Sequence, residues 1–291
     1  MNNEEITLCF TEQIGFGFGH ILNDIIASIW FAYTLIFYKL AVGEKGYILL
    51  VFGQIVDCIA TLFIGFFFDI KIENNKFFKT GVYKTWYMIG FIFSFIAFSH
   101  CFLELPFMIK NIETMFIIYS IAAFWAQVGW TFCQITHLAL LNVLSVTSAD
   151  RIRLTALRQG GSIYAAVIVF AYFWYTLAES QTHILNIQDI KLFASNVFWL
   201  NNFGFIHCLL FIYMLDEPKL IKRKKYLLDI SNLKSKSTKT YRKMDFYTKK
   251  DWLKEPSFYV VVRTILQYSL FLLLFYLFIY FIFYYFFIFY L

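Results

Sequence analysis

The 291-residue sequence has little charge and almost no proline. Asp, Glu, Lys and Arg together make up 15% of the chain, and proline occurs three times. Globular domains carry about 25% charged residues, so this chain has too few polar groups to cover a soluble core. Apolar residues reach 60%, a fraction that only a lipid environment accommodates. The composition therefore excludes a soluble domain and predicts an all-α, multi-pass membrane protein.

The sequence also lacks the patterns of a disulfide scaffold, a secreted precursor or a known enzyme. Its five cysteines are scattered, with no CxxC pair. The acidic start has neither the basic region nor the cleavage site of a signal peptide. No metal-ligand His cluster, GxSxG, HExxH or phosphate loop occurs, and His137 has no evident catalytic partner. We therefore expect no enzyme, cofactor or metal, and insertion directed by the first transmembrane helix.

What is present is a series of long apolar segments. A helix of about 20 apolar residues crosses roughly 30 Å of hydrocarbon. We predict an amino-terminal bundle over residues 1–215, a basic linker over 216–256 and a seventh segment over 257–291. The six helices of the bundle are predicted at residues 15–38, 47–68, 86–102, 115–140, 161–177 and 193–215, the third and fifth being short enough to extend into their loops.

Positive charge is unevenly distributed between the loops. The linker holds thirteen Lys and Arg, including the run 222–225, and the loops after the second and fourth helices add seven more. The loops after the first, third and fifth helices hold four in total. The positive-inside rule therefore predicts a cytosolic amino terminus and a cytosolic linker. At a helix end, the basic linker favours contact with anionic lipid over binding to nucleic acid.

The last segment of the sequence differs from the other six. Residues 268–291 contain only Phe, Leu, Ile, Tyr and one Ser. Helices packed inside a transporter usually present Gly, Ala, Ser or Thr at their interfaces, and this run offers no such packing face. Our hypothesis is that 257–291 is a partial or aberrant seventh helix that stands in place of a missing carboxy-terminal half.

Two carboxylates stand inside predicted membrane helices. An ionisable side chain in hydrocarbon is costly, so it marks a functional site by default. Asp24 follows His20 by four residues, and the two therefore share one face of the first helix. Asp57 lies in the second helix, one turn after Gln54. Each Asp is either a coupling site for a proton or cation, or a structural group satisfied by a neighbouring helix.

The fourth predicted helix carries a polar stripe. Gln127, Thr131, Gln134 and His137 follow steps of four, three and three residues, so they line one side of the helix. Such a stripe faces either a partner helix or an aqueous cavity. Hydrogen bonding between helices is sufficient to explain Gln127 and Thr131. Gln134 and His137 offer both donors and acceptors to a polar solute.

Arg158 comes just before the fifth predicted helix. It either extends along the helix to the membrane interface, or points inward. An inward guanidinium would bind an anion or a hydroxyl group, or would pair with Asp24.

Several of these stretches, in the same order, resemble the major facilitator superfamily domain-containing protein 12 family. The resemblance extends from about residue 14 to 262, and that family is similar in turn to the glycoside–pentoside–hexuronide cation symporters. It implies the major facilitator fold of twelve helices in two six-helix bundles, with a central site reached alternately from each side. The matching stretches are 19–24 (GHILND), 27–31 (ASIWF), 53–57 (GQIVD), 134–138 (QITHL), 154–158 (LTALR) and 252–259 (WLKEPSFY).

The resemblance also implies residue roles. Asp24 and Arg158 match residues that bind sugar in the bacterial symporters, and Asp57 matches the first of two helix-two carboxylates that hold the coupling cation. The second of these carboxylates falls at Thr61, and a further helix-four carboxylate falls at Gln134. A sodium site needs several hard oxygen ligands with negative charge. The two replacements argue against sodium, whereas Asp57 alone suffices to couple a proton.

The loop between the second and third helices resembles the gating motif of the superfamily, a Gly and an Asp followed by a basic segment. Val and Tyr at 82–83 stand where proline and a basic residue are more usual. The residues that correspond to the motif are Gly65, Asp69, Gly81, Lys84 and Trp86.

Together these features predict a symporter-type secondary transporter for a small polar solute. The bacterial symporters imply a sugar, and the animal family, which is associated with cysteine entry into lysosomes and melanosomes, implies cysteine. The expected membrane is that of a lysosome or another endomembrane, or the plasma membrane. The predicted solute site consists of His20, Asn23, Asp24, Gln134, His137 and Arg158.

A single bundle cannot complete the alternating-access cycle, because one bundle must rock against another. We therefore expect no transport by this chain as a monomer, and a need for the missing half or for a second copy. The alternative is a regulatory or structural membrane protein that does not transport.

Overall fold

The computed structural model describes residues 8–68, 80–178 and 185–236. The chain divides into two compact units, residues 1–233 and 234–291, and the architecture below is that of the first. Within the described residues the regular structure is helical, with no strand, which confirms the all-α prediction. The predicted seventh segment, 257–291, lies outside the described residues.

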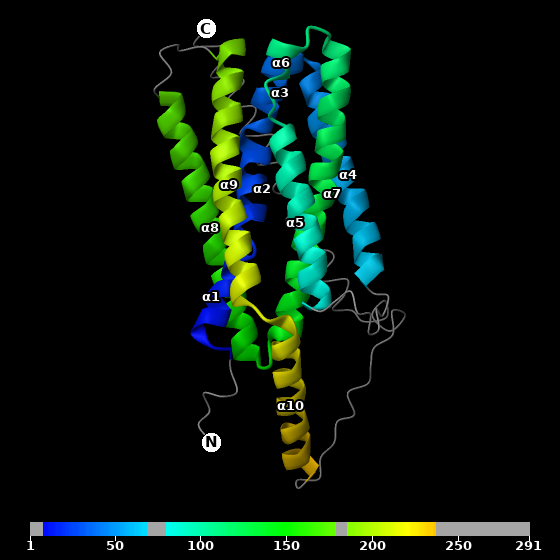
Figure 1. Ribbon diagram of the computed structural model, residues 1–291, viewed down its shortest axis with the longest axis vertical. Coiled ribbons are helices and arrows are strands. Elements are labelled where there is room, and N and C mark those ends of the chain that lie inside the picture. The colour runs from blue at the N-terminus through cyan, green and yellow to red at the C-terminus, as the bar shows by residue number, and fades with distance from the viewer. Residues whose placement is uncertain (1–7, 69–79, 179–184, 237–291) are drawn as a thin grey trace, which may run out of the picture. The chain divides into compact units, whose positions relative to one another are not determined.

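Within this part of the chain, six helical segments are long and apolar enough to cross a membrane, as predicted (Figure 1). The first span joins α1 and α2, and α4, α5, α7, α8 and α9 provide the other five. The elements are α1 (Phe10–Phe18), α2 (Ile21–Ala32), α3 (Thr34–Val42), α4 (Lys45–Phe68), α5 (Val82–His100), α6 (Leu105–Met108), α7 (Ile112–Leu144), α8 (Ser148–Ala178), a 3-10 turn (Ile187–Asp189), α9 (Ile190–Met214) and α10 (Glu217–Lys236).

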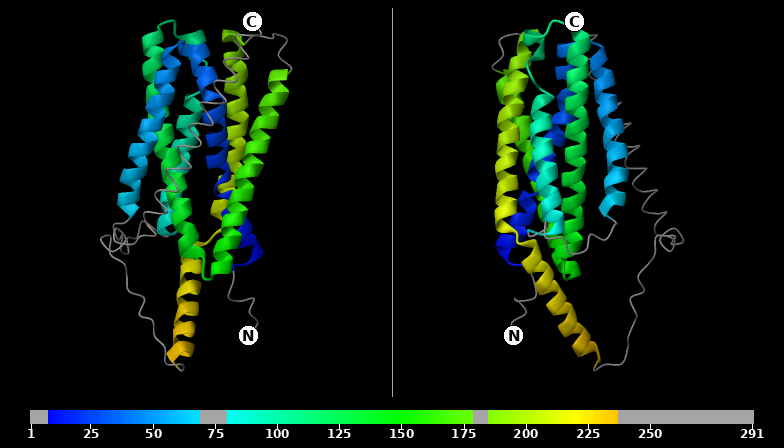
Figure 2. Two further views of the ribbon diagram at one scale, coloured as in Figure 1. Left: turned by 180° about the vertical axis from the view of Figure 1, so that it is seen from behind. Right: turned by 45° about the vertical axis from the view of Figure 1, so that its right-hand side comes forward.

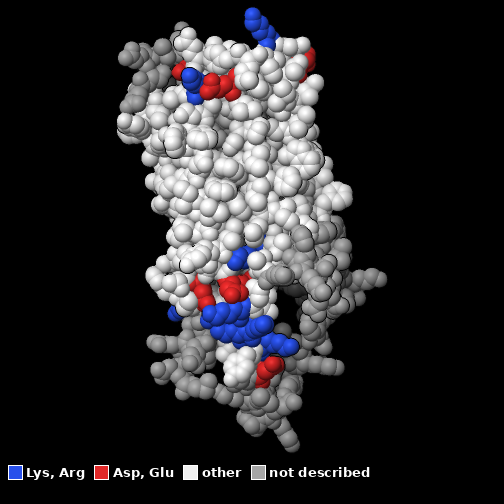
Figure 3. All heavy atoms as spheres, in the orientation of Figure 1, with Lys and Arg blue, Asp and Glu red and all other residues white. Residues whose placement is uncertain are grey.

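The surface of the bundle has the charge distribution of a membrane-spanning protein. On the face shown in Figure 3, the acidic and basic side chains that are coloured lie toward the two ends, and the surface between them is uncharged. Large apolar side chains on α4 and α8, such as Phe63 and Trp174, are 73% and 76% exposed. Exposed apolar area of this kind is stable in hydrocarbon or under a partner helix.

The first span is not the continuous helix predicted over residues 15–38. It is interrupted between α1 and α2 at Gly19 and His20, and again at Tyr33 before α3. At the first interruption the side chains of other helices satisfy the backbone: the Tyr87 hydroxyl donates to the Gly19 carbonyl over 2.7 Å, and His137 Nε2 contacts the Phe16 carbonyl at 2.8 Å. Membrane helices tolerate breaks where such partners replace the lost backbone bonds.

Glycine at position 19 makes this arrangement sterically feasible. A Cβ atom there would lie 2.7 Å from Phe211 Cδ2 and 2.8 Å from His137 Cδ2, closer than side chains can approach. The missing Cβ therefore brings α7 and α9 against the interruption, and it lets His137 reach the carbonyl end of α1. Apolar periodicity alone does not reveal this break, because the residues on both sides remain apolar.

The fifth span also differs from its predicted bounds. The predicted range begins at residue 161 with room to extend into the preceding loop, and α8 begins at Ser148. The earlier start is stabilised by a reciprocal cap, in which the Asp150 N–H donates to Thr147 Oγ1 and the Thr147 N–H donates to Asp150 Oδ2, both over 3.1 Å. Arg158 consequently lies in the helix interior and not at its start.

The helices pack closely where small residues face each other, and α2 lies between two groups of helices. Gly90 of α5 faces Gly129 of α7, and a Cβ on Gly90 would lie 2.6 Å from Phe132 Cβ. Small residues at such crossings let membrane helices approach closely. Figures 1 and 2 show α8 and α9 on one side of α2, and α4, α5 and α7 on the other. Side chains on α2 can therefore meet groups from both sides.

The beginning of the predicted linker forms a helix, α10, that is tied to the end of the bundle. The Glu217 carboxylate accepts the backbone N–H of Lys84 over 2.7 Å and that of Tyr83 over 3.3 Å, so it caps the amino-terminal end of α5. Arg223 pairs with Glu12 over 2.8 Å, and Lys224 Nζ donates to the Asn142 carbonyl over 2.9 Å. The linker therefore begins as a docked helix.

Candidate functional site

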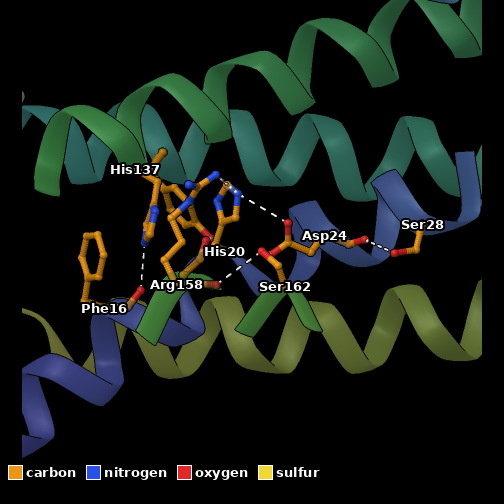
Figure 4. A network of polar contacts seen from close by, with 9 residues as sticks. Phe16, His20, Asp24, Ser28, His137, Arg158 and Ser162 are labelled. Atoms are coloured by element: carbon orange, nitrogen blue, oxygen red, sulfur yellow. Dashed lines mark hydrogen bonds and ion pairs between the residues drawn. The ribbon is translucent and has the colours of Figure 1, made fainter. Parts of the chain in front are cut away.

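Four ionisable side chains from three helices meet at the interruption of the first span. His20 and Asp24 come from the start of α2, His137 from α7 and Arg158 from α8, and Figure 4 shows them pointing toward one another. Arg158 Nη2 lies 2.9 Å from His20 Nε2, and this nitrogen lies 3.5 Å from Asp24 Oδ1. The rings of His20 and His137 stack with centroids 5.2 Å apart. We call these four residues the break cluster.

Hydrogen bonding assigns the proton positions on the two imidazoles. A carbonyl oxygen only accepts, so His137 carries a proton on Nε2, which it donates to the Phe16 carbonyl. A guanidinium only donates, so His20 Nε2 is unprotonated where it accepts from Arg158. The neutral His20 ring therefore carries its proton on Nδ1, and its 3.5 Å approach to Asp24 is not a hydrogen bond in this arrangement.

Asp24 has a hydrogen-bonding partner that the sequence analysis did not include. Ser162, one turn after Arg158 on α8, donates its hydroxyl to Asp24 Oδ2 over 2.8 Å. Arg158 points inward and contacts His20; within the described residues no ion pair between Arg158 and Asp24 falls within 4 Å. The four-residue spacing of Arg158 and Ser162 is visible in the sequence, but their separate partners, His20 and Asp24, are not.

Several polar atoms of this region remain without a hydrogen-bonding partner among the described residues. They are buried, and such groups in native proteins normally have a partner. The atoms are His20 Nδ1, His137 Nδ1, Arg158 Nε and Asn23 Oδ1. Together with the Asp24 carboxylate they present donors, acceptors and both signs of charge, and these are the groups that bind a small polar or zwitterionic solute.

The other predicted site residues lie at varying distances from this cluster. Asn23 is adjacent to Asp24 on α2 and is 5% exposed. Gln134 precedes His137 by one turn on α7 and is half-buried; no hydrogen bond recorded among the described residues joins it to the break cluster. Within the described residues, no three His, Cys, Asp or Glu side chains come together as ligands for a metal.

Asp57 belongs to a second, separate polar cluster between α4 and α7. Thr131 Oγ1 lies 2.8 Å from Asp57 Oδ1 and also 2.8 Å from the Gln127 carbonyl. The hydroxyl has one proton and can donate to only one of these acceptors at a time. If Thr131 donates to the carbonyl, Asp57 can complete the chain only as a protonated acid that donates to Thr131. Gln54 Nε2 and Gln127 Oε1 are buried without a partner among the described residues.

The residues that resemble the gating motif divide between the two sides of their loop. Gly65 lies in α4 with no atom of the described residues within 4 Å of its Cβ position, and Asp69 lies outside the described residues. Gly81 has φ +106°, a conformation that glycine adopts readily, and Glu217 fills the space where a Cβ would stand. Lys84 is buried and donates to the Leu215 carbonyl at the end of α9.

Glu217 is a functional candidate that the sequence analysis missed. It is 1% exposed, and burial raises the pKa of its carboxyl group, while the hydrogen bonds from the Lys84 and Tyr83 backbone and the charge of Lys84 oppose that rise. The only sequence signal was its position before Pro218, a typical start of a helix. Its partner, the amino-terminal end of α5, lies more than a hundred positions earlier in the chain.

The fold and the clusters define a class: an α-helical membrane protein of the transporter type, with ionisable side chains at a broken helix. Transporters bind solute and coupling ions where membrane helices are discontinuous. The sequence profile of the family described as MFS/sugar transport protein matches residues 15–224. The chain belongs to this family of major facilitator transporters.

Three curated relatives are named major facilitator superfamily domain-containing protein 12. The chain is 27% identical to that of Equus caballus over 87% of its own length and 55% of the relative's. It is 28% identical to that of Mus musculus over 70% of the chain and 45% of the relative, and 27% identical to that of Homo sapiens over 64% and 39%. The chain thus spans about half the length of these relatives. No solved structure gives a significant match.

Proposed function

We propose that this chain forms one bundle of a secondary active transporter that carries a small polar solute by alternating access. The observation that carries the proposal is the break cluster: a carboxylate, a guanidinium and two imidazoles at the discontinuity of a membrane helix. Ionisable groups within the membrane are costly and usually serve solute or ion pathways. A break in a helix that is buried among other helices also provides backbone groups that can bind a solute or an ion.

The proposed solute is a sugar or a cysteine-like amino acid. Asp24 accepts hydrogen bonds from hydroxyl groups or from an ammonium group, and Arg158 donates to hydroxyl groups or to a carboxylate. His20, His137, Asn23 and Gln134 supply further neutral donors and acceptors around these two charges. The description of the family, MFS/sugar transport protein, supports the sugar; the two opposite charges of the cluster support the zwitterion.

Asp57 is the proposed coupling group, and a proton the proposed coupling ion. The geometry that supports this is the Thr131 hydroxyl between Asp57 and the Gln127 carbonyl, because the direction of its hydrogen bond depends on whether Asp57 is protonated. A sodium ion would need more carboxylate ligands, and Thr61 and Gln134 stand at the other candidate positions.

The proposed cycle requires a second bundle facing the first. We place it against the exposed apolar faces of α4 and α8, of whose membrane-spanning residues only 28% and 17% are buried. Either a further bundle of the same chain or a second copy would fill this role.

The basic end, with α10, is proposed to lie in the cytosol. Of the run 222–225, Arg223 and Lys224 already contact the bundle, which leaves Lys222 and Lys225 exposed for anionic lipid.

The test is uptake by vesicles that contain the chain alone, or the chain joined to a second six-helix bundle from a relative. Radiolabelled cysteine and a panel of sugars are offered at two external pH values. We expect uptake of one solute class by the joined protein, with a pH dependence, and none by the chain alone. Uptake of no solute by a joined protein that is correctly inserted would favour a regulatory or structural membrane protein.

A further inference from the structure

The imidazole of His20 presents one nitrogen to two groups that make opposite demands on it. Nε2 lies 2.9 Å from Arg158 Nη2 and 3.5 Å from Asp24 Oδ1. Arg158 can only donate a proton to a hydrogen bond, and ionised Asp24 can only accept one. The same nitrogen can therefore serve Arg158 when it is unprotonated, or Asp24 when it is protonated, but never both.

The structure shows the first of these two states. The Arg158 contact has hydrogen-bonding length, whereas the Asp24 contact is too long for a hydrogen bond. Adding a proton to Nε2 would break the Nη2–H···Nε2 bond and would place two cations side by side. It would also create an Nε2–H donor next to the Asp24 carboxylate, where a charge-assisted hydrogen bond can form.

The groups around His20 have other hydrogen-bonding partners, so His20 is the group that exchanges Arg158 for Asp24. The Nε2 proton of His137 is held by the Phe16 carbonyl, so His137 offers its ring face to His20. The Tyr87 hydroxyl from α5 donates to the Gly19 carbonyl. On α8, Ser162 donates to Asp24 Oδ2 and leaves Oδ1 facing His20. His20 Nδ1 and Arg158 Nε are buried without partners in the described residues, so the cluster is not a closed structural network.

We propose that His20 is a proton-operated switch that pairs with Arg158 when it is neutral and with Asp24 when it is protonated. One proton bound at Nε2 thereby releases the Arg158 guanidinium and occupies the Asp24 carboxylate. This is a second proton site, separate from Asp57, and it lies within the solute site. Its consequence for uptake rests on the proposed transport function, but the exchange of partners does not.

The direct test is nitrogen magnetic resonance of the whole chain, labelled with 15N-histidine and 15N-arginine, in lipid nanodiscs. At high pH we expect neutral His20 with its proton on Nδ1 and a hydrogen bond to Arg158. At low pH we expect both ring nitrogens protonated, with loss of the arginine contact and a hydrogen bond to Asp24. A neutral His20 protonated on Nε2, or an arginine contact unchanged at low pH, would overturn the proposal. The His20 signals are assigned by comparison with His20→Gln.

A variant sharpens the test without changing the charge of His20. Arg158→Leu removes the donor, so the neutral ring should move its proton to Nε2 and donate to Asp24, with a tautomer preference of about tenfold or more for a bond to a charged group. Ser28→Ala is the matched control, because Ser28 donates only to the Asp24 backbone carbonyl. The control should keep the Nδ1 proton, and an unchanged tautomer in Arg158→Leu would contradict the switch.

The wild-type measurement decides the question even if Arg158→Leu does not assemble, since it needs no substitution. Uptake by the joined protein separates this inference from the proposed function. An exchange of partners without uptake of any solute would retain the switch and reject the transporter. Uptake with no exchange of partners would retain the transporter and reject the switch.

Discussion

The two polar clusters of the bundle each contain one carboxylate and side chains from α7, but the carboxylates meet different partners. Asp24 lies among a guanidinium, two imidazoles and a hydroxyl from α2, α7 and α8. Asp57 meets the Thr131 hydroxyl, with buried amide groups of Gln54 and Gln127 nearby on the same two helices. The charges of the first cluster suit the solute site proposed for it, and the single carboxylate of the second suits the proton site proposed there.

The difference originates in the backbone. At the break cluster the interrupted first span exposes carbonyl groups, and glycine at position 19 lets α7 and α9 approach them. The Asp57 cluster is built on α4 and α7, both of which continue as helices through it. The proposed solute site therefore lies at a discontinuous helix, and the proposed proton site lies between two uninterrupted helices.

Of the substitutions that test this comparison, Asp24→Asn should have the largest effect, and the effect should be on solute uptake. The amide keeps the shape and can still accept from Ser162, but the negative charge next to His20 and Arg158 is lost. We expect solute uptake by the joined protein to fall by about tenfold to a hundredfold, the cost of a hydrogen bond to a charged group. The measurement is initial uptake rate against solute concentration. Ser28→Ala should retain the wild-type rate, and retention by Asp24→Asn would remove Asp24 from the solute site.

Asp57→Asn should separate coupling from binding. An amide mimics the protonated acid and can still hydrogen-bond to Thr131, so solute binding should persist. We expect accumulation of solute driven by a pH gradient to be lost, while exchange of labelled for unlabelled solute continues with the pH dependence that His20 gives to solute binding. The assay compares both processes at two pH values. Accumulation in a pH gradient equal to that of the wild type would transfer the coupling role from Asp57 to another group.

Gly19→Ala should destabilise the break cluster without removing any polar group. Its Cβ would overlap Phe211 and His137, and overpacking of this kind costs about 1–3 kcal/mol. Thermal unfolding in detergent should occur at a lower temperature than in the wild type. Gly160→Ala is the control, because no described residue comes within 4 Å of its Cβ position. Equal destabilisation by both substitutions would show that the break does not depend on close packing at Gly19.

Glu217→Gln should have the smallest effect, at the end of the bundle away from both clusters. Because burial raises the pKa of Glu217 in the folded state, the folded protein binds the proton more tightly than the unfolded chain does. The contribution of Glu217 to stability is therefore greatest below its unfolded pKa of about 4.5, and it declines as the pH rises through the higher folded value.

The glutamine variant should lose this pH-dependent part, which we expect to be within about 1 kcal/mol given the opposing hydrogen bonds. Hydrogen exchange at the Tyr83 and Lys84 amides, corrected for the intrinsic pH dependence, measures it. Asp216→Asn, at the neighbouring acidic residue, serves as the control. An unchanged pH profile in Glu217→Gln would show that the cap does not respond to protonation.

The sequence alone was sufficient for the number of spans and for the identity of the costly groups. Apolar runs of membrane length predicted six helices, and the four-residue spacing of His20 and Asp24 predicted that they share a face. The predicted range of the fifth span starts later than α8 because charged residues such as Asp150, Arg151 and Arg153 interrupt the apolar run, although the Thr147–Asp150 cap is a local signal. The helix in the linker was missed because its contacts come from the distant residues Glu12, Lys84 and Asn142.

What the sequence determined by itself was the solvent: too few charges for water and too many apolar residues for anything other than lipid, with His20, Asp24, Asp57 and Arg158 as exceptions. What only the tertiary structure decided was the pairing of those exceptions. Hydrogen bonds between helices join residues more than a hundred positions apart, as with Arg158 and His20, and no local pattern records such a distance. The break at Gly19 is of the same kind, because the atoms that require it belong to α7 and α9.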